Sequence, residues 1–476
     1  YDFMKNKRNS LLWSFIDNFS QQIVNFIVGV ILARLLLPSD FSVIGVIMVF
    51  IAISNVFVNF GFNDAIINKK KVTQLDYSTV FWANITLGLL VYIILYFSSP
   101  FVELFFDMYN LSYYIRLTGL SIIFSSFSSI HRAKLSRELD FKTISVVSLY
   151  AVVISGASAI YMAYNGHGVI SLVLRMTLGQ FLTLLFFVIF NKWFPQIKFN
   201  FKLLKEIAAF SSNLFLSRLL NVLYNNVYYF IVGKIYLQDT LGFYTRAENY
   251  KNILSLNIAT AIQRVSFSEL SRYENKIQRE ESFLKFISIT IVLSFLSMLM
   301  LNICSHEIII ITVGLKWLPS VLLLKIMTLS GFFSPLYFIN LNYFAIIGNT
   351  KKLLQIEFLT KFFVIPVIFI GLYTNLECML FSIVCLNLLN LVVILITLKK
   401  MTLIIVAIQI KLIGKAFSYS LVIFAIYYLI LGDKVYYNVT VSLFLKVISI
   451  TIIFLSCYFV FQKKEITNLV KIFTTK

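Results

Sequence analysis

Two otherwise apolar segments of the chain each carry three polar side chains at helical spacing. The first set is Asp17, Gln21 and Asn25, and the second set is Arg218, Asn221 and Asn225. Because residues three or four apart share one face of an α-helix, each set forms a polar stripe. Carboxylate, amide and guanidinium groups in such stripes can hydrogen-bond a polar ligand and attract an anionic one.

The two stripes also share a register. A shift of 204 residues places Asp17 on Asn221 and Gln21 on Asn225. Polar groups in hydrocarbon are costly, so they usually face a bundle interior or a wet cavity. Matched stripes therefore predict the walls of one central pathway. The alternative is that they form hydrogen bonds that hold neighbouring helices together.

Two cations lie deep in apolar segments. Arg218 is close to the middle of one segment, and Lys251 is comparably deep in the next. An unpaired cation at this depth predicts a visiting anionic group, such as a lipid-linked phosphate or an acidic sugar. The alternative is a structural pair with Glu248, three residues before Lys251. Five further cations lie nearer the outer ends, where we expect them to snorkel: Arg34, Arg116, Arg175, Lys325 and Lys446.

No pattern in the sequence points to catalysis, a metal or a cofactor. The four cysteines are scattered, without metal-ligand or C-x-x-C spacing: Cys304, Cys378, Cys385 and Cys457. The three histidines fall in expected loops: His131, His167 and His306. A phosphate-binding G-x-x-x-x-G-K-[ST] sequence is absent. We therefore expect a protein that is not an enzyme.

The composition places these stripes in a membrane. Hydrophobic residues make up 59% of the chain and charged residues 13%, with a mean hydropathy of +0.87. Soluble domains carry about 25% charged residues, so the apolar surplus must face lipid. The first apolar stretch, which follows Tyr1, Asp2, Phe3 and Met4, is too long for the core of a cleavable signal.

We expect an all-α polytopic membrane protein with about fourteen transmembrane helices, since about 20 apolar residues span a bilayer. The expected spans are 11–36, 41–63, 79–99, 112–130, 143–163, 168–190, 206–232, 241–263, 286–303, 320–346, 353–373, 376–398, 412–431 and 438–461. Pro335 and Pro366 should kink the tenth and eleventh spans.

The net charge of +20 follows the same layout. With the N-terminus inside, the outer segments hold only Lys234, Lys316 and Lys434, while most of the other basic residues fall in inner segments. The positive-inside rule then predicts that both termini are cytoplasmic. It also accounts for the net charge without nucleic acid.

An internal repeat divides the chain. Residues 26–29, Phe-Ile-Val-Gly, recur as residues 230–233, and residues 116–121 resemble residues 325–330. We expect two six-helix lobes related by a pseudo-twofold axis along the membrane normal. The expected divisions are an N-terminal lobe over 1–200, a second lobe over 201–400, and two additional helices with a cytoplasmic tail over 401–476.

Several short motifs carry a resemblance to a known family. They are Ala33-Arg34-Leu35-Leu36 with Pro38 and Asp40-Phe41, Tyr77-Ser78-Thr79-Val80-Phe81-Trp82 with Asn84, Arg137-Glu138-Leu139-Asp140-Phe141-Lys142, Gly166-His167-Gly168-Val169, Gly233-Lys234, Leu241-Gly242-Phe243-Tyr244 with Arg246-Ala247, and Gly314-Leu315-Lys316-Trp317 with Ser320. Together they resemble the polysaccharide flippase family of the multidrug/oligosaccharidyl-lipid/polysaccharide exporter superfamily. The similarity is greatest to its colanic-acid and teichuronic-acid branch. The chain departs from the family pattern at Ser266-Phe267-Ser268, where the family usually has Phe-Pro.

The resemblance implies a transporter of a bacterial inner membrane, one that flips undecaprenyl-pyrophosphate-linked oligosaccharide outward by alternating access. Arg218 and Lys251 would attract the anionic headgroup, and the two stripes would hydrogen-bond sugar hydroxyls. Membrane lipids and a coupling ion, H⁺ or Na⁺, are further expected partners. Two alternatives stay open: an ion-coupled multidrug exporter, in which Asp17 would be the key carboxylate, and a membrane polysaccharide polymerase or glycosyltransferase.

Overall fold

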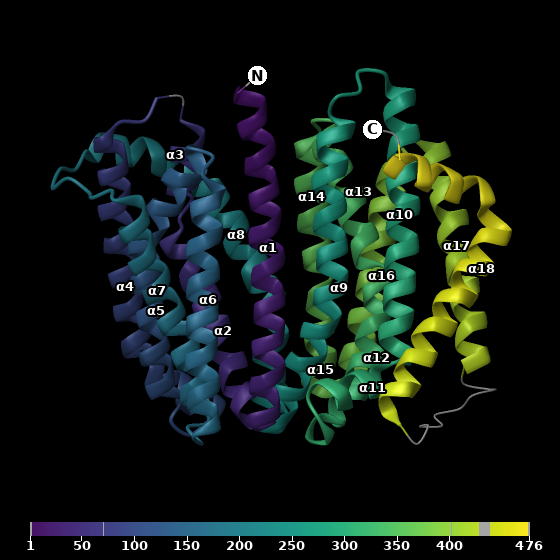
Figure 1. Cartoon of the computed structure of the whole chain (residues 1–476), viewed down its shortest axis with the longest axis horizontal. Helices are drawn as coiled ribbons and strands as arrows, with labels where there is room; N and C mark the ends of the chain where they lie inside the picture. Colours follow the sequence, from purple (N-terminus) through teal and green to yellow (C-terminus); the bar gives the residue numbers. More distant parts are fainter. Residues whose placement is uncertain (1, 70, 401, 428–437, 475–476) are drawn as a thin grey trace. The chain divides into compact units, whose positions relative to one another are not determined.

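All regular structure in the described part of the chain is helical (Figure 1). The computed structural model describes residues 2–69, 71–400, 402–427 and 438–474. Within these ranges no strand occurs, which confirms the expected all-α class. The chain forms two compact units, Tyr1–Gly242 and Phe243–Lys476.

The first unit is built mainly from eight helices. They are α1 (Asp2–Leu35), α2 (Pro38–Val58), α3 (Phe62–Asn68), α4 (Gln74–Phe106), α5 (Leu111–Arg137), α6 (Phe141–Tyr164), α7 (Val169–Asn191) and α8 (Phe201–Ile235). Helix α4 packs on α5, α6 packs on α7, and α1 lies along α6. Helix α8 packs against α2, α3 and α4.

The second unit begins within α9, which starts in the first unit. Its helices are α9 (Gln238–Leu270), α10 (Lys276–Ile303), α11 (Ser305–Thr312), the short 3₁₀ helix η1 (Leu315–Trp317), α12 (Pro319–Gly331), α13 (Ser334–Ile346), α14 (Thr350–Phe362), α15 (Val364–Tyr373), α16 (Leu376–Lys399), α17 (Leu403–Ile426) and α18 (Val439–Thr474). Helix α10 is central, since it contacts α12, α13, α17 and α18.

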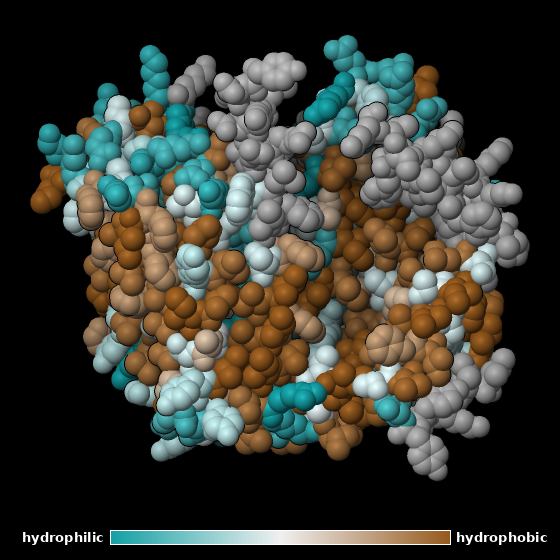
Figure 2. Space-filling view, in the orientation of Figure 1, coloured by the Kyte–Doolittle hydropathy of each residue, from teal (hydrophilic) through white to brown (hydrophobic). Residues whose placement is uncertain are grey.

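The helices confirm the expected membrane layout. By length and composition, ten helical segments of the described chain could cross a membrane, with α12–α13 and α14–α15 each counted as one. Four further long helices, α1, α5, α8 and α9, bring the segments to the fourteen expected. Figure 2 shows hydrophobic side chains in a band across the visible faces and hydrophilic ones toward the ends. Phe97, Phe101 and Leu104 are more than two-thirds exposed, as lipid-facing residues should be.

Two expected boundaries are wrong. The second span was placed at 41–63, but α2 ends at Val58 and a separate seven-residue helix, α3, follows Gly61. Gly61 has a φ of 92°, a conformation that glycine adopts without the strain of a Cβ atom. The thirteenth span is expected at 412–431, but α17 begins at Leu403, and residues 428–431 lie outside the described part of the chain.

The expected kinks occur as breaks just before each proline. Helix α12 ends at Gly331 and α13 begins at Ser334, whose next residue is Pro335. Helix α14 ends at Phe362 and α15 begins two residues before Pro366. Because proline has no N–H, the hydrogen bond to the carbonyl four residues earlier is lost at these points.

The segment between α7 and α8 is tied to α4 by hydrogen bonds. The Trp193 indole donates to Gln74 Oε1 (2.7 Å), and the Trp82 indole donates to the Gln196 carbonyl (2.9 Å). The Gln196 amide donates to Ser78 Oγ (2.9 Å). These bonds explain why α8 belongs to the first unit. The lobe divisions at 200 and 400, which follow the sequence repeat, remain a prediction.

Two of the three histidines lie in helices and not in loops. His131 is buried within α5, where its Nδ1 is 3.1 Å from Asn191 Nδ2. His306 lies in the first turn of α11. In the described residues no group of three or more histidine, cysteine, aspartate or glutamate side chains could hold a metal ion.

Candidate functional site

The first predicted stripe is present on α1. Asp17 is buried, Gln21 is half-buried and Asn25 is exposed. Gln21 Nε2 donates to Asp17 Oδ1 at 2.6 Å, which places these two side chains on one face as their spacing predicts. The buried carboxylate is thus stabilised by an amide of its own helix.

Two cations from other helices reach this stripe. Arg175 of α7 donates a hydrogen bond from Nη2 to Asn25 Oδ1 at 2.7 Å. Arg132 of α5 interacts electrostatically with Asp17, and its Nη2 donates to Ser148 Oγ at 3.0 Å. Arg132 is exposed and Arg175 is half-buried. The α1 stripe therefore lies in a cationic environment within the first unit. We call these five residues the α1 cluster: Asp17, Gln21, Asn25, Arg132 and Arg175.

The second stripe lies on α8, and its cation has a partner. Arg218 Nη1 is 2.8 Å from Asp64 Oδ2 of α3, with side chains 45% and 37% exposed. The expectation that Arg218 is unpaired is therefore wrong. Asn221 is half-buried and Asn225 is exposed. Since α1 packs mainly on α6 and α8 on α2 and α4, each stripe has its own surroundings.

Lys251 belongs to the second unit. It is half-buried on α9, and its ammonium group interacts electrostatically with Glu248. This contact agrees with the pair that the sequence offered as an alternative. One turn earlier, the buried Arg246 guanidinium lies over the Trp317 ring, 5.0 Å from its centroid. Such a stacked guanidinium is stabilised by the ring's negative face.

Several cations that we expected to snorkel have partners inside the protein. Besides Arg175, Arg116 Nε donates to Ser99 Oγ (3.0 Å), with its guanidinium 4.3 Å from the Tyr96 ring centroid. Lys446 is buried beside Glu307, at an Nζ–Oε1 distance of 2.5 Å. The expectation of snorkelling is thus wrong for the buried Lys446, and it stays a prediction for the half-buried Arg116 and Arg175. Their partners lie on other helices, which spacing along one helix cannot show.

Sequence reasoning also missed three functional candidates: Arg132, Arg175 and Asp64. Arg132 falls in a basic inner segment of the expected layout, and Arg175 falls near an outer end. Asp64 follows Gly61, whose break of the second span was the available signal. Groups of these kinds are suited to anionic and hydroxyl-bearing ligands, because charged groups and amides form strong, directional hydrogen bonds.

Comparison with known proteins shows the family and agrees with the fold. The sequence profile of a family described as "Polysaccharide biosynthesis protein" matches residues 31–322. The chain is 26% identical over 282 residues to "Teichuronic acid biosynthesis protein TuaB" of Bacillus subtilis (strain 168), over 58% of each chain. It is 21% identical over 304 residues to "Lipopolysaccharide biosynthesis protein WzxC" of Escherichia coli (strain K12), over 63% of this chain and 62% of the relative. The match thus spans less than two thirds of these relatives.

A solved structure shares the fold. It is "Lipid II flippase MurJ, inward closed conformation", with a TM-score of 0.79 and 17% sequence identity, over 96% of this chain and all of that chain. At this identity the likeness concerns the fold alone. The family profile, however, covers more than half of the chain. The chain is therefore a multi-pass membrane protein that belongs to the polysaccharide biosynthesis protein family.

Proposed function

We propose that the protein flips a lipid-linked oligosaccharide precursor, carried on undecaprenyl pyrophosphate, across a membrane by alternating access. The observation that carries the proposal is Arg218, a cation on a membrane helix that remains accessible. On the same face of α8, Asn221 is half-buried and Asn225 is exposed. Charged side chains within membrane helices are costly and usually mark a substrate path. A pyrophosphate joined to sugars presents the matching anionic and hydroxyl groups.

Each predicted residue has a part in this proposal. Arg218 in the first unit and Lys251 in the second are each suited to attract a pyrophosphate, since guanidinium and ammonium groups form charge-assisted hydrogen bonds with phosphate oxygens. Amides and a carboxylate hydrogen-bond sugar hydroxyls: Gln21, Asn25, Asn221, Asn225 and Asp17. Arg132 and Arg175, which contact the α1 stripe, add positive charge around it. The lipid tail stays in the bilayer, where burial of its methylene groups is favourable.

The proposed location is a bacterial cytoplasmic membrane with both termini in the cytoplasm. The two curated relatives described above are bacterial, and basic residues concentrate in alternate segments. Reporter fusions after Lys71, Lys142 and Lys400 should all report cytoplasm. A periplasmic signal at any of these positions would contradict the orientation.

Deletion of the gene tests the function directly. Lipids extracted from the deletion strain should contain an accumulated polyprenyl-diphosphate oligosaccharide, and a plasmid copy of the gene should remove it. The matched control is a plasmid copy with Arg218→Ala, which should leave most of the intermediate in place at normal protein abundance. A deletion strain with an unchanged lipid-linked pool would contradict the proposal.

One observation favours a second candidate, an ion-coupled multidrug exporter of the same superfamily. Asp17 is a buried carboxylate on a membrane helix, and such a group can carry a coupling proton or sodium ion. In that case Asp17→Asn should abolish resistance to cationic drugs. Transport of a lipid-linked oligosaccharide that survives Asp17→Asn would separate the two candidates.

A further inference from the structure

The Arg218–Asp64 ion pair is open to its surroundings. The two side chains are 45% and 37% exposed, with the guanidinium and carboxylate 2.8 Å apart. At these exposures the protein encloses neither side chain, so packing does not hold the pair closed. It can therefore open readily, and a more highly charged anion can take the carboxylate's place.

The structure nevertheless holds Asp64 firmly beside α8. At the start of α3, Gly61 approaches Ser211 of α8 so closely that a Cβ at Gly61 would lie 2.9 Å from the Ser211 Cβ. Next to this contact, the ring of Phe215 stacks on Phe60 with centroids 4.4 Å apart. Phe215 precedes Arg218 by three residues and shares its face of α8.

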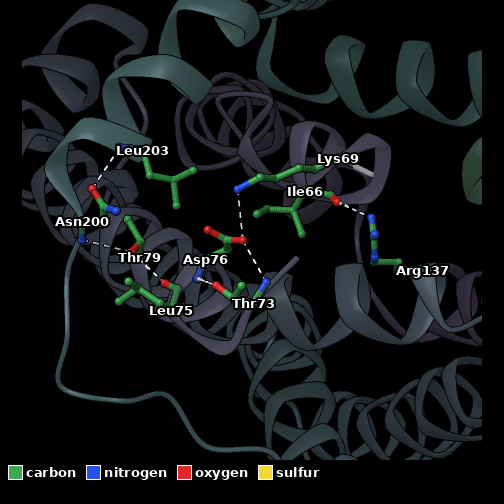
Figure 3. A network of polar contacts seen from close by, with 9 residues as sticks. All are labelled: Ile66, Lys69, Thr73, Leu75, Asp76, Thr79, Arg137, Asn200 and Leu203. Carbon is green, nitrogen blue, oxygen red and sulfur yellow. Dashed lines mark hydrogen bonds and ion pairs between the residues drawn. The ribbon is translucent and has the colours of Figure 1, made fainter. Parts of the chain in front are cut away.

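The other end of α3 is fixed by a second network (Figure 3). Arg137 of α5 donates from Nη1 to the carbonyls of Ile66 and Ile67, at 2.8 and 2.9 Å. Lys69, directly after α3, lies 3.0 Å from Asp76 Oδ2 at the start of α4. The two bonds from Arg137 occupy carbonyls at the helix end that have no partner within the helix. Contacts at both ends of a seven-residue helix thus set the position of Asp64.

We propose that Asp64 is a built-in counter-ion for Arg218, which a diphosphate headgroup displaces when it binds. The inference rests on the proposed function and adds a specificity residue to it. In the absence of substrate, Asp64 keeps the guanidinium oriented. A diphosphate carries more negative charge than one carboxylate and can displace Asp64, whereas a singly charged headgroup gains too little by the exchange. After displacement, the nearby carboxylate repels the bound anion and favours its release.

Opposite effects of the two partners distinguish this role from a structural one. If the pair is structural, removing either partner lowers the free energy of unfolding. Loss of a competing counter-ion strengthens anion binding, and loss of the cation weakens it. Asp64→Asn keeps the size of the side chain and removes its charge. Glu138→Gln is the matched control, because Glu138 is exposed and pairs with Lys134 and not with Arg218.

The experiment measures binding to the purified full-length protein in detergent micelles. The probes are farnesyl diphosphate, farnesyl monophosphate, farnesol and inorganic pyrophosphate. We expect Asp64→Asn to bind farnesyl diphosphate about three- to tenfold more tightly than wild type. Binding no longer has to break the weak Arg218–Asp64 ion pair, and the Asp64 carboxylate no longer repels the diphosphate. Its preference for diphosphate over monophosphate should shrink. Arg218→Ala should bind more weakly, and Glu138→Gln should match wild type.

The outcomes separate the inference from the proposed function. Equal binding of farnesyl diphosphate to wild type and Asp64→Asn would overturn the counter-ion role and leave the function standing. Asp64-dependent binding of inorganic pyrophosphate, without binding of the farnesyl compound, would support the counter-ion role and contradict a lipid-linked substrate. Absence of any diphosphate binding to either protein would overturn the inference. If Asp64→Asn fails to fold, Asp64→Ser provides the same comparison.

Discussion

The molecule contains two ion pairs between helices that differ in exposure. In the first unit, Arg218 and Asp64 are 45% and 37% exposed. In the second unit, Lys446 and Glu307 are 11% and 0% exposed. The exposed pair is open to exchange of one partner for a ligand, because the protein encloses neither charge. The buried pair cannot exchange without leaving a charge in a dry interior, so it serves structure.

The contacts around the buried pair support this contrast. Glu307 Oε1 accepts hydrogen bonds from both Lys446 Nζ (2.5 Å) and Ser442 Oγ (2.9 Å). Glu307 lies on α11 and its two partners on α18, so the bonds fasten the last helix to the rest of the second unit. We therefore expect exposure, more than the presence of charge, to separate ligand-binding cations from structural ones in this chain.

The largest expected effect is on stability, from Glu307→Gln. The change leaves the buried Lys446 ammonium without its counter-charge, which should cost about 3–5 kcal/mol of the free energy of unfolding. Thermal unfolding in detergent micelles, followed by tryptophan fluorescence, measures it. The double variant Glu307→Met with Lys446→Met should recover most of the loss, since it buries no charge. An unchanged unfolding temperature for Glu307→Gln would show that the pair is not structural.

The second effect is on binding, from Arg218→Ala. A lost charged hydrogen bond is worth about 1.5–3 kcal/mol, so affinity for a diphosphate lipid should fall about ten- to a hundredfold. The free energy of unfolding should change by only about 0–1 kcal/mol, because the pair is exposed. Arg218→Lys should rescue binding in part, as it keeps the charge and loses the planar fork. A large loss of stability with unaltered binding would reverse the contrast between the two pairs.

The smallest effect concerns the helix that presents Asp64. Gly61→Ala would place an alanine in a left-handed backbone conformation, at a φ of 92°. Its Cβ would also lie only 2.9 Å from the Ser211 Cβ. We expect a loss of about 1–2 kcal/mol in the free energy of unfolding, together with altered diphosphate affinity. Gly166→Ala is the matched control, because Gly166 has a φ of 81° but open space around it. Equal diphosphate affinity in both variants would mean that the placement of α3 does not affect diphosphate binding.

Much of the fold could be predicted because hydropathy and charge act locally. Apolar runs of about 20 residues marked the spans, and Pro335 and Pro366 marked breaks that the structure shows. The stripe formed by Asp17 and Gln21 followed from helical spacing alone. In each case the signal and its effect lie within a few turns of one helix.

The partners of the cations could not be predicted, because they depend on packing between distant helices. Arg175 bonds Asn25, which lies 150 residues earlier, and Lys446 bonds Glu307, which lies 139 residues earlier. Nothing in the spacing along one helix selects these pairs. Asp64 was missed for another reason: α3 has seven residues, too few to show a helical period next to a long apolar span.

Translocation in proteoliposomes tests the central claim most directly. Purified protein is reconstituted with a fluorescent polyprenyl-diphosphate-linked sugar, and the label exposed on each leaflet is measured with time by an impermeant quencher. Wild type should speed exchange of the label between leaflets over protein-free vesicles, Arg218→Ala should lose most of this activity, and Arg218→Lys should keep part of it. The account would be contradicted if wild type exchanged the label no faster than protein-free vesicles. It would also be contradicted if Arg218→Ala exchanged the label as fast as wild type.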